Sequence, residues 1–182
     1  MMSRVCRIIL SLFGWKVSGY ERLHSLRQYI IIVAPHTSNW DFPLGLLVRK
    51  GFGMDKVRYL GKSNLFKPPL GWIFRALGGY PVDRSKSNNM VGSYVEVFRT
   101  HPDFAIVLAP EGTRKKVAHF KTGFYFIAQG AGIPIIPCIF DWGHHEVRFL
   151  EPFYTGNDPE AEIAFLENLF RGVKGRNREN EF

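Results

Sequence analysis

Short apolar runs alternate with amphipathic segments along most of the chain. Runs rich in β-branched and aromatic residues predict strands over residues 29–34, 56–61, 104–109 and 135–140, and a return strand over 146–150. Segments with apolar residues at helical spacing predict helices over residues 41–50, 69–77, 88–101, 123–131 and 158–171. Strands that alternate with helices favour an α/β fold, in which a single layered domain has a mainly parallel sheet flanked by helices.

The first 17 residues predict an additional N-terminal amphipathic helix that lies in a membrane interface. As a helix, this segment has a broad apolar face with basic residues at its edges. The apolar residues are Val5, Ile8, Ile9, Leu12, Phe13 and Trp15, and the basic ones are Arg4, Arg7 and Lys16. The run is too short and too interrupted to span a bilayer, which takes about 18 to 20 apolar residues, and it lacks the features of a secretory signal. An amphipathic helix packed on the domain remains the alternative.

The rest of the chain predicts one domain followed by a tail. With 182 residues and 46% hydrophobic composition, the chain fits a single core, which we expect over residues 18–171. Residues 172–182 are polar and lack periodicity, which predicts a disordered tail. Cys6 and Cys138 have neither zinc-ligand spacing nor the pattern of a disulfide framework. We therefore expect no bound metal and a reducing, cytoplasmic environment.

Positive charge is concentrated in the first two thirds of the sequence. Residues 1–121 contain 19 Lys and Arg against 7 Asp and Glu, whereas residues 122–182 contain 5 against 9. Together with 15% aromatic residues, this indicates an anionic partner that also has an apolar part. A non-enzymatic basic module that binds an anionic membrane or nucleic acid is one class of protein with this composition. A basic surface that is merely solvated is the other explanation of the charge.

Two of the predicted strands end in loops that carry reactive side chains. Because ligands bind at the carboxyl ends of strands in parallel sheets, these loops are the place to look for a site. The first loop holds His36 and, five residues later, Asp41 at a predicted helix start. There the Asp41 carboxylate can fix the tautomer of His36 and leave its other nitrogen as a base. A buried histidine beside a helix-capping aspartate is the competing interpretation.

The second loop contains the tetrapeptide Glu111-Gly112-Thr113-Arg114, which follows the predicted strand 104–109 and Pro110. This tetrapeptide is expected by chance about once in a thousand chains of this length. Gly112 permits close approach of the backbone to a ligand, and Arg114 offers a planar fork for phosphate. No G-x-S-x-G nucleophile motif is present and neither cysteine is close in sequence, so the nucleophile is expected to be the hydroxyl of the substrate.

Residues 33–137 closely resemble the glycerolipid acyltransferase family, of which the 1-acylglycerol-3-phosphate (lysophosphatidic acid) acyltransferases are the best-known members. Four family blocks occur in order. They are the H-x4-D motif at His36 to Asp41, a Gly/Arg block at 78–84, the E-G-T-R block at 111–114, and an apolar run with prolines at 133–137. Their combination and order make the resemblance strong.

The resemblance implies transfer of a fatty acyl group from an acyl thioester, carried by acyl-CoA or acyl carrier protein, to a hydroxyl of a lysolipid. His36 would be the general base and Asp41 its orienting partner. The acceptor would be held by residues of the later blocks and two lysines, namely Arg84, Glu111, Gly112, Thr113, Arg114, Lys62 and Lys121. No bound cofactor or metal is implied, and the acceptor most typical of the family is 1-acylglycerol-3-phosphate, which gives phosphatidic acid.

Two departures from the family pattern bear on substrate and location. Lys115 and Lys116 follow Arg114 where family members often have serine, which leaves another lysolipid, such as a lyso-aminolipid, as an alternative acceptor. Only 35 residues precede His36, where many members have a longer membrane-embedded region. We therefore expect a cytoplasmic protein bound peripherally to an anionic membrane surface, with no nucleic-acid partner.

Overall fold

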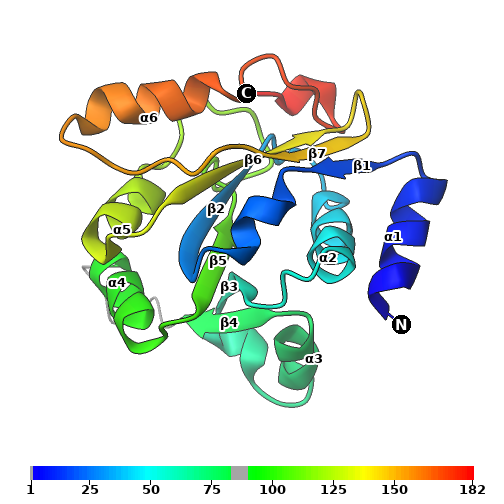
Figure 1. Cartoon of the computed structure of the whole chain (residues 1–182), viewed down its shortest axis with the longest axis horizontal. Coiled ribbons are helices and arrows are strands. Elements are labelled where there is room, and N and C mark those ends of the chain that lie inside the picture. Colours follow the sequence, from blue (N-terminus) through cyan, green and yellow to red (C-terminus); the bar gives the residue numbers. More distant parts are fainter. Residues whose placement is uncertain (1, 83–89) are drawn as a thin grey trace.

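A computed structural model describes residues 2–82 and 90–182, and its centre is a seven-stranded sheet (Figure 1). In order across the sheet the strands are β1 (Lys16–Ser18), β7 (Glu146–Phe149), β6 (Ile135–Asp141), β2 (Gln28–Ala34), β5 (Phe104–Leu108), β3 (Val57–Lys62) and β4 (Gly79–Val82). The five strands from β6 to β4 are parallel to one another, whereas β7 and β1 run antiparallel to β6. The predicted α/β fold with a mainly parallel sheet is confirmed.

Helices cover both faces of this sheet. The helices are α1 (Met2–Leu12), α2 (Asp41–Gly51), α3 (Gly71–Ala76), α4 (Met90–Thr100), α5 (Gly123–Ala131) and α6 (Pro159–Asn168). Alternate side chains of a strand point to opposite faces, so Ile30 and Ile32 of β2 pack with α4, α5 and α6, whereas Ile31 and Val33 pack with α1 and α2. Residues 29–34 are therefore all buried, which explains why β2 is a continuous apolar run.

The predicted elements agree with the observed ones to within a few residues, except that two strands are missed. β1 and β4 contain only three and four residues, so neither is long enough to show a period. β4 also contains Pro81, a residue that argues against a central strand but is accommodated at the edge of a sheet, where β4 lies.

The N-terminal helix is shorter than predicted. α1 ends at Leu12, and Gly14, at φ 73°, turns the chain so that Lys16 begins β1 and Trp15 packs edge-on against Trp142. On the inner side of α1, Cys6 and Leu10 are buried, whereas several apolar side chains are exposed: Met2, Val5, Ile8, Leu12 and Phe13. Among the helices of residues 2–82 and 90–182, none has the length and apolar character needed to cross a membrane.

Residues 172–182 are packed against the domain, so the prediction of a disordered tail is wrong. The Asn177 backbone N–H donates to Thr37 Oγ1 at 3.1 Å, and its side-chain amide donates to the Thr37 carbonyl at 3.0 Å. Phe182 packs on Phe120 with 4.4 Å between ring centroids. These partners are distant in sequence, and local periodicity carries no information about such contacts.

Candidate active site

The candidate site lies at the carboxyl edge of the sheet. Strands β2, β5 and β6 are neighbours and run parallel, so the loops that follow them meet at this edge. These loops carry His36 after β2, Glu111 after β5 and Trp142 after β6. Residues more than 100 positions apart in the sequence are thereby brought into direct contact.

His36 and Asp41 form a hydrogen-bonded pair. His36 Nδ1 lies 3.0 Å from Asp41 Oδ2, which also accepts from the Ser38 backbone N–H at 2.9 Å. The other carboxylate oxygen, Oδ1, accepts from Trp142 Nε1–H at 2.7 Å. Because a carboxylate only accepts, this contact requires the proton on Nδ1 and leaves Nε2 free to act as a base.

Asp41 is the first residue of α2, in agreement with the predicted helix start. The N-cap is Trp40 rather than Asp41, and the Trp40 side chain makes no cap hydrogen bond. The Asp41 carboxylate turns back toward the preceding loop, and Asp41 is 4% exposed. It therefore binds both the His36 side chain and the Ser38 backbone within the loop.

Glu111 lies beneath this loop rather than in a cavity. It is 2% exposed, and Oε1 accepts a hydrogen bond from the His36 backbone N–H at 3.0 Å. Burial raises the pKa of the Glu111 carboxyl, and the His36 N–H partly offsets this effect. Glu111 was predicted to bind the acceptor, but its contact joins the end of β5 to the backbone of the loop that carries His36.

We expect Glu111→Gln to make the protein more stable at pH 8 than the native chain. Since the pKa of the folded state is raised, the folded carboxyl holds its proton more tightly than the unfolded one, and native stability falls as pH rises above about 4.3. A glutamine oxygen still accepts from His36 without this cost. Denaturant unfolding at pH 4 and pH 8 should show a gain at pH 8 that disappears at pH 4.

The matched control is Glu96→Gln, at an exposed position of α4, which should show no such gain. A Glu111→Gln chain that is equally destabilised at both pH values would contradict the assignment of an unfavourable buried charge.

The remaining predicted residues fall into three groups. Gly112 has φ 66°, and the Lys121 side chain packs directly against it, so that a Cβ at this position would lie only 2.7 Å from Lys121 Nζ. Thr113 and Arg114 are exposed at the rim of a polar cavity. Lys62 ends β3, but its side chain is outside the described part of the structure, and Arg84 lies outside the described residues.

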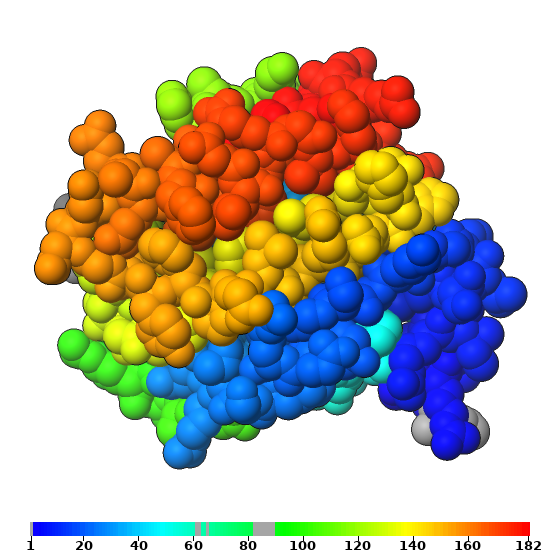
Figure 2. Space-filling view, turned by 45° about the horizontal axis from the view of Figure 1, so that its top comes forward, coloured from blue at the N-terminus to red at the C-terminus, as the bar shows by residue number. Residues whose placement is uncertain are grey.

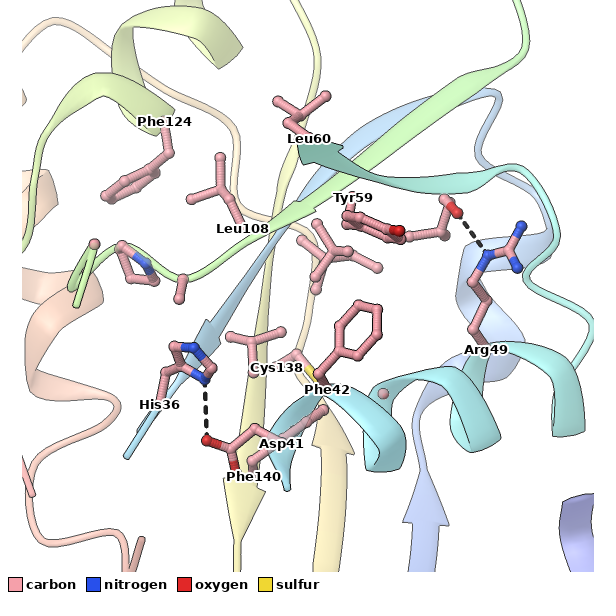
Figure 3. A pocket seen from close by; sticks show the side chains of 18 of the residues that line it. His36, Asp41, Phe42, Arg49, Tyr59, Leu60, Leu108, Phe124, Cys138 and Phe140 are labelled. Atoms are coloured by element: carbon pink, nitrogen blue, oxygen red, sulfur yellow. Dashed lines mark hydrogen bonds and ion pairs between the residues drawn. The ribbon is translucent and has the colours of Figure 1, made fainter. Parts of the chain in front are cut away.

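An apolar cavity of about 510 Å³ opens beside His36. It extends along α2 and over the ends of β3 and β5 to α4 and α5. Figure 3 shows His36 and Asp41 at one end and Arg49 at the other, with Phe42 between them. Its volume is in the range of pockets that bind small molecules or cofactors, and its lining suits an aliphatic chain.

A second, open cavity lies on the other side of His36. It is about 1230 Å³ in volume and has polar and basic lining residues that include Arg114, Lys115, Asn177 and Asn180. His36, Leu60, Ala109 and Gly112 line both cavities. The imidazole therefore stands at the boundary between an apolar space and a basic one.

The described geometry is therefore an α/β sheet with a His–Asp pair at its carboxyl edge, in which the histidine borders both an apolar and a basic cavity. Residues 14–141 match the family described as Acyltransferase, and the chain belongs to this family. It is 30% identical over 178 residues to the 1-acyl-sn-glycerol-3-phosphate acyltransferase of Saccharomyces cerevisiae, a match that covers 85% of this chain and 56% of that protein. It is 29% identical over 113 residues to the Escherichia coli protein of the same name, covering 59% and 44%.

The fold is shared with a solved structure. The 1-acyl-sn-glycerophosphate acyltransferase of Thermotoga maritima superimposes with a TM-score of 0.65 at 23% identity, covering 94% of this chain and 76% of that one. The chain spans about half the length of the two curated relatives named above.

Sequence reasoning missed several residues of the site. Trp142, Asn177 and Asn180 border or contact the catalytic loop, and Phe42 and Arg49 line the apolar cavity. Trp142 could have been found, because it directly follows β6, the strand next to β2 at the same edge. The others have no pattern in the sequence.

Proposed function

We propose that this protein is an O-acyltransferase that moves a fatty acyl group from an acyl thioester to the hydroxyl of a lysophospholipid. The favoured acceptor is 1-acylglycerol-3-phosphate, which yields phosphatidic acid, and the donor is acyl-CoA or acyl carrier protein. The observation that carries the proposal is the position of His36 between the two cavities. It supports the proposal because the apolar cavity suits an aliphatic chain and the basic cavity suits an anionic headgroup, and His36 borders both.

In this mechanism His36 Nε2 takes the proton from the acceptor hydroxyl as its oxygen attacks the thioester carbonyl. The tetrahedral intermediate collapses, the C–S bond breaks, and the thiolate takes the proton back from the imidazolium. The products are one ester and one free thiol. Asp41 keeps the ring oriented and stabilises its positive form while the proton is held there.

The basic cavity is proposed to hold the acceptor headgroup. Arg114 stands at its rim with Lys115 and Thr113, and a guanidinium can bind two phosphate oxygens at once. Lys121 lies over Gly112, which lines both cavities, and itself lines the apolar one. Arg84, which the family resemblance adds to this set, lies outside the described residues.

We expect Arg114→Lys to raise the KM for 1-acylglycerol-3-phosphate by about tenfold and to leave the KM for the thioester unchanged. The reason is that the lysine ammonium, a point charge, replaces a bidentate guanidinium–phosphate contact, and this loss costs on the order of 1 kcal/mol of binding free energy. Steady-state kinetics with each substrate varied in turn measure both constants. Arg99→Lys, at an exposed position of α4, is the control.

A panel of acceptors tests the proposed substrate. The lysophosphatidate should be acylated faster than a lyso-aminolipid of equal chain length. Preference for the lyso-aminolipid, together with an unchanged KM in Arg114→Lys, would reassign the acceptor. A folded chain that acylates neither acceptor would overturn the enzyme assignment in favour of a basic binding module.

We further propose that α1 docks the protein peripherally on the cytoplasmic surface of an anionic membrane. Figure 2 shows α1 (dark blue) at one edge of the molecule. The outward apolar side chains Ile8, Leu12 and Phe13 are 58%, 79% and 69% exposed, and burial of each in lipid favours binding by roughly 1.5 to 3 kcal/mol before ordering costs. Arg4 and Arg7, both exposed, add an attraction to anionic lipid that salt screens.

Replacing Ile8 and Leu12 together with glutamine should release the protein from anionic vesicles in a sedimentation assay. Both side chains are exposed, so the unfolding midpoint should stay the same. Deletion of residues 1–17 would instead remove buried Leu10 and two of the three residues of strand β1. Activity on detergent-dispersed acceptor should be retained. Undiminished vesicle binding by the double variant would place the docking surface elsewhere.

A further inference from the structure

The indole of Trp142 contacts the catalytic carboxylate from outside the region that matches the family. Its Nε1–H donates to Asp41 Oδ1 at 2.7 Å, and the family match ends at residue 141. Asp41 uses Oδ2 for His36 and Ser38, so the bond from Trp142 engages the remaining oxygen and fixes the plane of the carboxylate. Without this donor, that oxygen would be buried and unpaired, a costly state that rotation of the carboxylate would relieve.

The C-terminal segment holds Trp142 in this orientation. The Trp142 backbone N–H donates to the Lys174 carbonyl at 2.8 Å. The Arg176 guanidinium carbon lies 4.9 Å from the centroid of the Trp142 ring and 5.3 Å from the centroid of the Trp40 ring. Figure 2 shows the C-terminal residues (red) beside the β6–β7 hairpin (yellow). Arg176 thus links the Trp142 indole, which contacts Asp41, to the indole of Trp40, the residue before Asp41 in the chain.

The same segment also binds the loop between His36 and Asp41. The Asn177 backbone N–H and its side-chain amide both donate to Thr37, which is 1% exposed. Gly175 is packed so closely on Thr37 that a Cβ would lie 2.7 Å from its Oγ1. A hydrogen bond within the C-terminal segment joins its two ends, since the Gly175 N–H donates to Glu181 Oε1 at 3.1 Å.

We propose that residues 174–180 form a strap that orients the catalytic pair, with Trp142 as the positioning residue for Asp41 and Arg176 as the residue that holds Trp142. The inference rests on the proposed function, because it concerns the geometry of the same His36 base. The strap contacts the loop at Thr37 and reaches the Asp41 carboxylate through Trp142. Asn177 and Asn180 of the strap also line the basic cavity, so the tests change Trp142 and Arg176, which are among the lining residues of neither cavity. These changes should lower the rate of the chemical step and leave substrate binding unchanged.

The first test is Trp142→Phe, which keeps an aromatic ring and removes the N–H donor. We expect kcat to fall by about 10- to 100-fold, as misplacement of a catalytic group does, with the KM for donor and acceptor within about twofold of the native values. Trp72→Phe, at an exposed position of α3, is the matched control and should keep the native kcat. Native kcat in Trp142→Phe would overturn the proposal.

A second test uses the strap itself. Arg176→Gln should lower kcat. Arg176→Lys should restore most of it, because a cation remains over the two indole rings. The control is Arg178→Gln, which removes the same charge from an exposed position of the same segment. If Arg176→Gln and Arg178→Gln behave alike, Arg176 does not hold Trp142 and the strap assignment fails.

A third measurement does not depend on acyl transfer and so separates failure of the strap from failure of the proposed function. Amide hydrogen exchange reports the opening of the loop, since the His36 and Ser38 N–H groups are both hydrogen-bonded to carboxylates. Arg176→Gln should accelerate exchange at these two amides by about tenfold or more, compared with Arg178→Gln. Equal exchange in the two variants would overturn the strap, whether or not the native chain transfers acyl groups.

Discussion

Replacing His36 with alanine is expected to lower kcat by about 10² to 10⁴, the usual contribution of a positioned general base. The base that takes the proton from the acceptor hydroxyl in the proposed mechanism would then be missing, whereas the walls of both cavities would remain. The side chain of His36 is 28% exposed, so the folded state should survive its loss. Steady-state kinetics on detergent-dispersed acceptor measure kcat without interference from membrane binding.

His24→Ala is the control, because His24 is an exposed histidine on the 3-10 helix 20–24. It should retain native kcat. If the His36→Ala variant has the melting temperature of the native chain and also its kcat, His36 is not the general base.

Asp41→Asn is expected to lower kcat by about 10⁴, the loss seen when the carboxylate of another His–Asp pair is replaced by an amide. Asp41 accepts from His36, Ser38 and Trp142, and an amide has one oxygen for these three donors. An NH₂ group would therefore face at least one N–H, and the neutral amide would no longer stabilise an imidazolium. A stability loss of about 1 to 3 kcal/mol should accompany the change.

Asp55→Asn is the matched control, since Asp55 is exposed and pairs with Lys50 at the end of α2. Circular dichroism and denaturant unfolding should show that both variants fold. A kcat in Asp41→Asn equal to that of Asp55→Asn would mean that Asp41 serves the fold alone.

The architecture could be predicted because each buried strand is recognisable from its own short stretch of sequence. β2, β5 and β6 are covered on both faces, so they are continuous apolar runs between prolines or polar loops. β1 and β4 are edge strands of three and four residues, and their pairing depends on partners more than 15 residues away. Their sequences therefore carry no period to detect.

The candidate site was predicted in part for a similar reason. His36, Asp41 and the 111–114 block follow strong strands, so the rule for carboxyl edges brings them together. The rule does not say how each side chain turns. Burial turns Glu111 toward the His36 backbone instead of the cavity, and the contacts of Trp142 and Asn177 arise only when the C-terminal segment folds over the loop.

The most direct test of the account is the stoichiometry of one reaction. The native chain is mixed with an acyl thioester and 1-acylglycerol-3-phosphate, free thiol is titrated, and the lipid product is identified by mass spectrometry. The account predicts one phosphatidic acid for each thiol released, and neither product above background with His36→Ala. Thiol release with free fatty acid in place of phosphatidic acid, or no thiol release at all from the folded native chain, would contradict it.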